Sequence, residues 1–355
     1  MSYGLELVNN DVNSSAHALN INTAIKTSLS TRYPDGGSQL FSAGIFFSHR
    51  WEINKKWLLA DGLRLSYSDL NSKFRDQTFF PFPFNTVTQN NTALNGNVSL
   101  LYKPDNNWHL SILGSTGFRV PNVDDLSKVF ESVPGSIIVP NPDLKPERTY
   151  NTEMTIGRRF DNQTTFSMNG FYTWYEDAIT TQPFLFNGQS AMMYNGVLSK
   201  VTANVNAQKA YIYGFSGDVS ILLIKNLKFR SNATYTYARI TSTNPEQALD
   251  HIPPFFGMSS MSYYNNKYHV EFSVQHNGAK RLADFNPNGE DNLPQATPTG
   301  MPAWTILNIR TGYQLSKAFK IQMALENILD QNYRVFASGI SAPGRNFIVS
   351  LRGNY

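Results

Sequence analysis

Apolar and polar residues alternate at every second position along about fourteen segments of this chain, the pattern of β-strands with one apolar face. No helical periodicity of comparable length is present. Each segment has roughly ten residues, the length at which a tilted strand crosses a bilayer. The clearest examples are residues 94–102, 166–174, 270–276 and 319–325. The pattern predicts an all-β protein whose strands expose an apolar face to lipid.

One segment departs from the alternation. Asp61 falls on the same face as Leu59, Leu63 and Leu65. A β-bulge, a charge at the membrane interface or a different strand register would each explain it.

The connections between the segments alternate strictly between short and long. Short turns are expected at residues 53–56, 103–107, 160–163, 224–227, 264–267 and 315–318. Long links are expected near residues 11–38, 69–91, 119–148, 176–208, 241–253, 280–302 and 331–345. Outer-membrane barrels place short turns in the periplasm and long loops outside the cell. The connections therefore predict a transmembrane antiparallel β-barrel.

The C-terminal segment fixes the orientation of this predicted barrel. Phe347, Val349, Leu351 and Tyr355 share one face, and a terminal aromatic residue closes the strand. This ending resembles the signal by which barrels are recognised for membrane assembly; the alternative is an ordinary edge strand that ends in Tyr. If the strand ends in the periplasm, every short turn is periplasmic and every long link is extracellular.

Composition and charge agree with a membrane barrel. Aromatic residues make up 13% and charged residues 16% of the chain, where soluble proteins carry about 25% charged residues. The net charge of +4 is spread along the chain, so no nucleic-acid partner is expected. Without cysteine, disulfides and thiolate metal sites are excluded. No apolar run approaches the roughly 20 residues of a membrane helix, so a membrane form must be a barrel.

Three motifs resemble those of a known family. "GFRVPNVDDL" (residues 117–126) followed by "NPDLKPE" (141–147) is similar to the paired boxes of TonB-dependent haem and haemoglobin receptors. "ENILDQNYR" (326–334) and "APGRNFIVSL" (342–351) resemble the family's last two strands. The resemblance implies the bacterial outer membrane and a barrel of about 22 strands around a plug. The chain is then expected to be a single domain, residues 1–355, that lacks the plug, the signal peptide and about eight strands.

The resemblance also implies which residues contact a ligand. They are Phe118, Arg119 and Pro121 of the first box and Asn141, Pro142 and Leu144 of the second. The alternative is that both boxes only shape a loop, since proline stiffens the backbone and Asn-Pro-Asp favours a turn. The family usually carries a histidine between the boxes, but none lies between Pro121 and Asn141. His17 and His251, in predicted extracellular links, are the remaining candidates for a ligand contact.

Uptake of an iron-bearing ligand is the expected function, with haem or a haem protein as cargo. The expected partners are outer-membrane lipid and, through the missing plug, the TonB protein. No resident metal and no covalently bound cofactor are expected. A siderophore or cobalamin receptor and a passive porin or adhesion barrel are the alternatives. The sequence contains no catalytic motif such as a nucleophile elbow or HExxH, so an enzyme is not expected.

Overall fold

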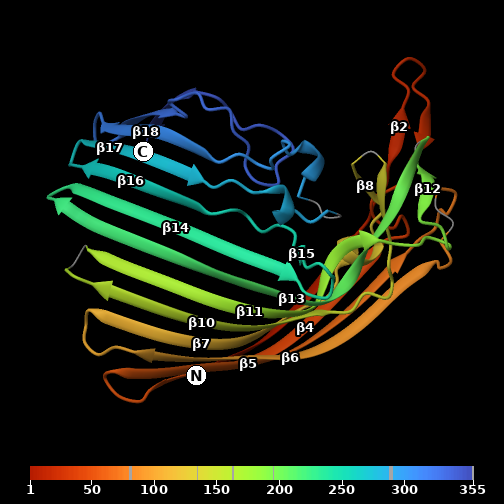
Figure 1. Ribbon diagram of the computed structural model, residues 1–355, viewed down its shortest axis with the longest axis horizontal. Coiled ribbons are helices and arrows are strands. Elements are labelled where there is room, and N and C mark those ends of the chain that lie inside the picture. Colours follow the sequence, from red (N-terminus) through yellow and green to blue (C-terminus); the bar gives the residue numbers. More distant parts are fainter. Residues whose placement is uncertain (80–81, 134, 162–163, 195, 288–290, 354–355) are drawn as a thin grey trace.

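The protein is one large β-sheet with long connecting segments at one end (Figure 1). The computed structural model describes all residues except 80–81, 134, 162–163, 195, 288–290 and 354–355. Tyr355, the last residue of the proposed assembly signal, therefore lies outside the described residues. The helices are single turns, α1 (Val123–Ser127), η1 (Leu282–Asp284) and η2 (Leu293–Gln295). Among the residues described, no helix is long and apolar enough to cross a bilayer.

The sheet contains eighteen strands, and four of these are short pieces within the loops. The four are β8 (Phe130–Val133), β9 (Ser136–Val139), β12 (Ala191–Tyr194) and β15 (Gln247–Ala248). Eighteen less these four leaves fourteen longer strands, which pair antiparallel in chain order. They are β1 (Ser2–Val12), β4 (Ser38–Glu52), β5 (Trp57–Lys73), β6 (Thr86–Tyr102), β7 (Trp108–Arg119), β10 (Glu147–Arg159), β11 (Thr165–Pro183), β13 (Val197–Ile224), β14 (Leu227–Ile240), β16 (Phe256–Tyr264), β17 (Tyr268–Asn277), β18 (Trp304–Gln314), β19 (Phe319–Glu326) and β20 (Asn346–Gly353). The prediction of about fourteen antiparallel strands is confirmed.

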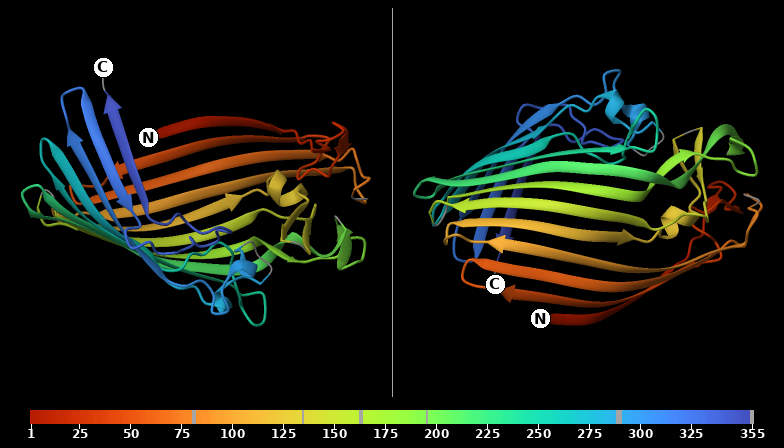
Figure 2. Two further views of the ribbon diagram at one scale, coloured as in Figure 1. Left: turned by 90° about the horizontal axis from the view of Figure 1, so that it is seen from above. Right: turned by 60° about the horizontal axis from the view of Figure 1, so that its bottom comes forward.

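The sheet curls into a partial barrel, with β1 and β20 as its two edge strands (Figure 2). It does not close within the described part of the chain. Five of the six predicted short turns lie at one end, together with the described residues 160–161 of the sixth, whose residues 162–163 lie outside the described part of the chain. The described parts of the long links lie at the other end. The alternation of short periplasmic turns with long extracellular loops is therefore confirmed.

Two predicted links are shorter than expected, because strands continue beyond the membrane. β5 and β6 leave only residues 74–85 as a link where 69–91 was predicted. β11 and β13 likewise extend into the predicted link 176–208 and leave residues 184–196. In these extensions polar side chains are buried as well as apolar ones, among them Thr181, Thr202 and Asn204, so exposure no longer alternates along the strand.

The outer face of the sheet is apolar and the inner face is polar. On the outer face, Ile45, Leu63 and Leu65 expose 59%, 57% and 48% of their surface. Side chains that lipid covers in the membrane show such exposure when the chain is taken by itself. On the inner face, the Arg64 guanidinium of β5 pairs with Glu6 of β1 at 2.8 Å. The barrel wall is thus stabilised by ladder hydrogen bonds and by lipid, and not by an apolar interior.

Asp61 belongs to the outer face and causes no irregularity in the ladder. The pairing of β5 with β4 and with β6 continues through this residue without a register shift. Its carboxylate lies 3.1 Å from Nδ1 of His49 on the neighbouring strand. Asp61 lies on the same face as Trp57, two pleat repeats after this residue, which begins β5 at the periplasmic end. Of the three explanations, a charge near the membrane interface is the one the structure supports.

Aromatic side chains form a belt at each end of the outer face. At the periplasmic end, Trp57 stacks on Tyr102 with ring centroids 4.3 Å apart. At the other end, tyrosines stack across β11, β13 and β14, among them Tyr172 and Tyr213. Trp and Tyr favour these levels because their rings are apolar and their polar atoms reach water. The two belts mark the membrane-spanning part of the wall.

The largest apolar core lies in the extracellular loops and not in the barrel. It joins the loop between β5 and β6, the loop between β7 and β10, and the start of β13; its fully buried members include Leu70, Leu126, Ile137 and Val201. A separate hairpin of β2 (His17–Leu19) and β3 (Lys26–Ser28) projects beyond this core (Figure 1). The core gives the extracellular end a folded base on which side chains can hold fixed positions.

Candidate ligand-binding loops

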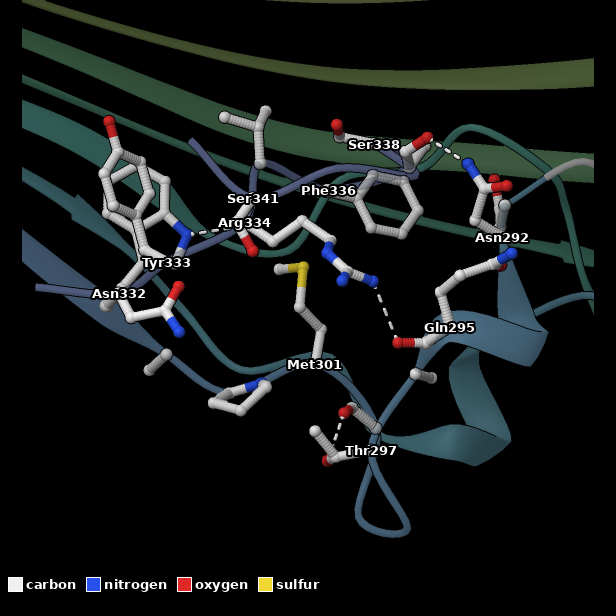
Figure 3. Close-up of a pocket in the computed structure, with 18 of the residues that line it drawn as sticks. Asn292, Gln295, Thr297, Met301, Asn332, Tyr333, Arg334, Phe336, Ser338 and Ser341 are labelled. Carbon is white, nitrogen blue, oxygen red and sulfur yellow. Dashed lines mark hydrogen bonds between the residues drawn. The ribbon is translucent and has the colours of Figure 1, made fainter. Parts of the chain in front are cut away.

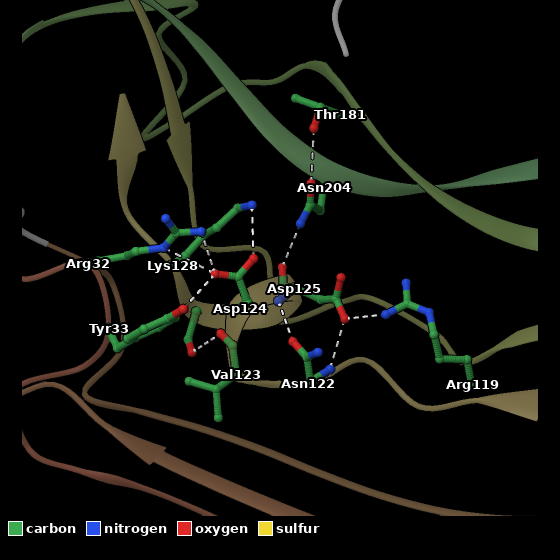
Figure 4. A network of polar contacts seen from close by, with 11 residues as sticks. Arg32, Tyr33, Arg119, Asn122, Val123, Asp124, Asp125, Lys128, Thr181 and Asn204 are labelled. Atoms are coloured by element: carbon green, nitrogen blue, oxygen red, sulfur yellow. Dashed lines mark hydrogen bonds and ion pairs between the residues drawn. The ribbon is translucent and has the colours of Figure 1, made fainter. Parts of the chain in front are cut away.

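Arg119 closes the base of the loop between β7 and β10. Its Nη1 donates to Oδ2 of Asp125 at 2.6 Å, and its Nε donates to the carboxylate of Glu147, the first residue of β10. The Glu147 side chain is only 3% exposed and also accepts the backbone N–H of Ile179 on β11 at 2.6 Å. One guanidinium therefore ties together the two ends of the loop and the helix inside it. Figure 4 shows its contact with Asp125 of the helix.

The helix α1 begins where the sequence supplies a capping box. The Asn122 side chain accepts the N–H of Asp125, and the Asp125 carboxylate accepts the N–H of Asn122, both at 3.0 Å. Pro121, directly before the cap, is fully buried. A five-residue helix is marginal alone, so this turn depends on its caps, on Arg119 and on burial of its apolar face.

Asn141 fastens the second box to β13. Its Nδ2 donates to the carbonyl of Asn204 at 2.8 Å, and its Oδ1 accepts the N–H of Asp143 at 3.1 Å. The Asn204 side chain in turn donates to the carbonyl of Asp125 and accepts the hydroxyl of Thr181 (Figure 4). This buried network connects both boxes to the strands behind them. Leu144, from the same box, is buried in the apolar core beside this network.

A second loop joins the network from the N-terminal side. Asp124 of α1 accepts Nη2 of Arg32 at 2.9 Å, the hydroxyl of Tyr33 at 3.0 Å and Nζ of Lys128 at 3.1 Å (Figure 4). Burial disfavours the charged carboxylate, but the Lys128 ammonium and Arg32 guanidinium outweigh it and hold the pKa of Asp124 below its ordinary value of 3.8. The loop between β1 and β4 is thereby held against α1.

The other predicted ligand residues lie at different places. Phe118 is partly exposed and Pro142 is exposed, both beside the base of the loop. His17 lies on the projecting hairpin, and His251 follows β15 with a left-handed backbone, φ 60°. The structure brings Arg119, Pro121, Asn141 and Leu144 into one network and brings neither histidine to it. No group of three His, Asp or Glu side chains is placed to hold a metal among the described residues.

Residues that the sequence analysis did not single out complete the network. Glu147, Asn204 and Arg32 come from segments far apart in the chain. Arg119 and Glu147 stand at the two ends of one long link and within the paired boxes, which are the sequence signals that relate them. Burial of Pro121, Asn141 and Leu144 favours a loop-shaping role for these three residues, the alternative left open by the sequence.

Replacing Asn141 by Ala is expected to lower the free energy of unfolding by about 1–2 kcal/mol, because the Asn204 carbonyl loses its buried donor. Urea unfolding of the reconstituted protein measures the change. Asp143→Ala, at an exposed position of the same turn, is the matched control and should change little. An equal loss in the two variants would contradict the buried role of Asn141.

Acid is expected to loosen the contact between α1 and the loop of Arg32. A carboxyl group whose pKa is lower in the folded protein stabilises it above the pKa of the unfolded chain. That stabilisation is lost as the pH falls below 3.8 and through the lowered pKa of Asp124. Hydrogen exchange of residues 31–33 should increase below pH 4, a window set by the ordinary aspartate pKa, and Asp124→Asn should remove the step. A step that persists in Asp124→Asn would assign the pH dependence to another group.

The fold and these loops define a class of protein: the wall and folded extracellular loops of an outer-membrane β-barrel. The family model described as TonB dependent receptor-like, beta-barrel, matches residues 2–328. The chain belongs to this family.

Curated relatives are distant and much longer. The iron-regulated outer membrane virulence protein of Vibrio cholerae serotype O1 is 25% identical over 245 residues, which cover 67% of this chain and 36% of that protein. The probable hemoglobin and hemoglobin-haptoglobin-binding protein 4 of Haemophilus influenzae is 23% identical over 255 residues, 68% of this chain and 25% of that protein. The chain thus spans about a third or less of the length of these relatives.

Among solved structures, the copper transporter OprC superposes on 99% of this chain with a TM-score of 0.80 and 17% sequence identity. The matched part is 53% of that chain. At this identity the likeness shows the fold alone.

Proposed function

We propose that residues 1–355 act as a single domain that supplies part of the barrel wall and the ligand-capture loops of a TonB-dependent receptor for an iron-bearing ligand. Haem or a haem protein is the first candidate for this ligand. The printed descriptions of the relatives, iron-regulated and hemoglobin-binding, support an iron-related cargo. The observation that carries the proposal is the folded extracellular base, in which both sequence boxes are fixed by Arg119 and Asn141.

The proposed partners follow from the same assignment. Lipid of the outer membrane covers the apolar face between the aromatic belts. The TonB protein would act through a plug, which accompanies the barrel in this family. We also propose that Phe347, Val349 and Leu351 of β20, all exposed on one face, belong to an assembly signal that ends at Tyr355.

Haem titration of the reconstituted protein tests the cargo. If an extracellular histidine contacts haem iron, a shift of the Soret band should appear and should be lost in His17→Ala or His251→Ala. His109→Ala is the matched control, because His109 lies near the periplasmic turn. Tight binding of a ferric chelate without a Soret shift would replace haem by a siderophore as cargo. Binding of neither would overturn the proposal and favour a passive barrel.

A further inference from the structure

We infer that a groove on the outer face of the barrel, beside the extracellular aromatic belt, binds one membrane lipid that carries an anionic phosphate group. The groove has a volume of about 190 Å³ and is lined by the end of β14 and by parts of residues 249–255 and 279–284. The inference rests on the proposed function in one respect, that lipid covers the outer face. It does not depend on the cargo that the loops capture.

The groove forms because β14 extends further than its neighbour β16. The ladder between the two strands ends at the pair of Thr234 and Phe256, whereas β14 continues to its last residue beside β15 (Figure 1). Pro253 and Pro254, just before β16, have no N–H groups with which to continue this ladder. The edge of β14 beyond Thr234 therefore borders a groove until it meets β15 at Arg239.

The part of β14 that lines the groove faces the membrane side of the wall. Tyr235, Tyr237 and Arg239 occupy alternate positions of the strand and all line the groove. Tyr237 lies opposite Tyr213 in the ladder and packs against it with ring centroids 5.4 Å apart, so it belongs to the extracellular aromatic belt. The groove therefore lies at the level where the bilayer meets water.

Much of the lining is apolar. Tyr235 and Phe255 are exposed, and Ile252 with the two prolines Pro253 and Pro254 completes this part of the groove. An acyl chain that covered these side chains would remove apolar surface from water, which contributes about 25 cal/mol per Å². The lining thus fits the hydrocarbon part of a lipid.

The rest of the lining carries charge. Nη2 of Arg239 donates to Oδ1 of Asp284 at 2.5 Å, and Nε of Arg281 donates to Oδ2 of the same carboxylate at 2.9 Å. Lys280, 4% exposed, lies 3.9 Å from the Asp291 carboxylate, which offsets its charge. Two guanidinium groups therefore share one carboxylate, and one positive charge is left over. A phosphodiester headgroup supplies the negative charge that this balance lacks.

Arg281 is the cation that a phosphate can reach. Its side chain is 77% exposed, against 12% for Arg239. Nε and Nη2 of Arg281 contact Asp284, whereas its Nη1 makes no hydrogen bond within the described residues. A phosphate oxygen can therefore bind Nη1 while the contact with Asp284 is kept.

The loop that carries Arg281 is held in place by its own turn and by the last extracellular loop. Backbone hydrogen bonds at 2.9 and 2.8 Å pair Lys280 with Met301. Nη1 of Arg334 donates to the carbonyl of Gln295 at 3.0 Å and joins this loop to the residues after β19 (Figure 3). A backbone fixed in this way places Arg281 at the groove before a lipid binds, which reduces the entropy lost on binding.

Native mass spectrometry of the chain in detergent micelles tests the groove. Phosphatidylglycerol, with one net negative charge, is compared with phosphatidylcholine of the same acyl chains, which has none. We expect one phosphatidylglycerol to bind about fivefold more tightly, which corresponds to the roughly 1 kcal/mol that a basic residue contributes near a membrane surface. Glycerophosphoglycerol, the same headgroup without acyl chains, should not bind, because it leaves the apolar lining uncovered.

Substitutions of the charged residues change the balance in opposite directions. Arg281→Gln leaves the groove neutral and should abolish the preference for phosphatidylglycerol. Asp284→Asn leaves two positive charges and should increase it by about a further fivefold. Arg158→Gln is the matched control and should leave the preference unchanged; Arg158 is also an exposed cation of the outer face, 4.7 Å from the ring of Trp108 at the periplasmic end.

The outcomes separate this inference from the proposed function. Equal affinity for the two lipids, or equal losses in Arg281→Gln and Arg158→Gln, overturns the groove as a phosphate site even if an iron-bearing ligand is captured. Binding of glycerophosphoglycerol alone overturns the lipid as its occupant. Selective binding of phosphatidylglycerol that Arg281→Gln removes supports the inference even if no iron-bearing ligand binds. The comparison of two lipids on the unaltered chain does not depend on whether a variant folds.

Discussion

Arg119→Ala should lower the free energy of unfolding by about 2–4 kcal/mol. The substitution leaves the Glu147 carboxylate, 3% exposed, without its cation, and breaking a buried pair from one side costs about 3–5 kcal/mol. The lower range is used because the Arg119 side chain is 47% exposed, so water screens part of the interaction. The same change releases Asp125 from the loop end and should increase proteolysis between residues 120 and 146. Urea unfolding and limited proteolysis in lipid vesicles measure the two effects.

Arg148→Ala is the matched control for this prediction. Arg148 lies opposite Phe118 in the ladder, on the outer face and exposed. It should change the free energy of unfolding by no more than about 0.5 kcal/mol, as surface substitutions usually do. Arg119→Lys should restore little of the loss, because an ammonium does not bridge two carboxylates as a planar guanidinium does. Equal effects of Arg119→Ala and Arg148→Ala on the free energy of unfolding would show that Arg119 does not stabilise the base of the loop.

The strands could be predicted from the sequence because lipid and water impose opposite requirements on the two faces. Residues 166–174 alternate for this reason and lie within β11. The prediction was least accurate where strands leave the membrane. Beyond that level both faces of β13 are buried, with Val201 and Ala203 on one face and Thr202 and Asn204 on the other, so lipid and water no longer impose opposite requirements on them.

The contacts of the candidate site could not be predicted in the same way. The resemblance implied that Arg119 contacts a ligand, but its partner Glu147 is 28 residues away and is reached only when the long loop folds back. The amide of Asn141 meets Asn204 across 63 residues. Such pairings depend on the arrangement of separate loops, which periodicity does not specify.

Leu63→Arg should destabilise the barrel by about 2–4 kcal/mol, the cost of an arginine at the midplane on the lipid face of a barrel. Leu63 lies on the outer face of β5, midway between Trp57 in the periplasmic aromatic belt and Tyr67 near the other end of the apolar band, and is 57% exposed in the isolated chain. In a bilayer that exposed surface meets hydrocarbon. Urea unfolding of the protein in thin-bilayer vesicles measures the change.

Two further variants isolate the effect of lipid. Leu63→Ala removes the same apolar contacts without a charge and should cost clearly less, because in a bilayer both side chains face apolar surroundings. Asn97→Arg adds the same charge to a lumen-facing position, opposite Gly62 in the ladder, where water and polar side chains accept it. If Asn97→Arg were as destabilising as Leu63→Arg, the charge and not its position would decide the cost. The face of β5 that carries Leu63, Leu65 and Tyr67 would then not be the one in contact with the membrane.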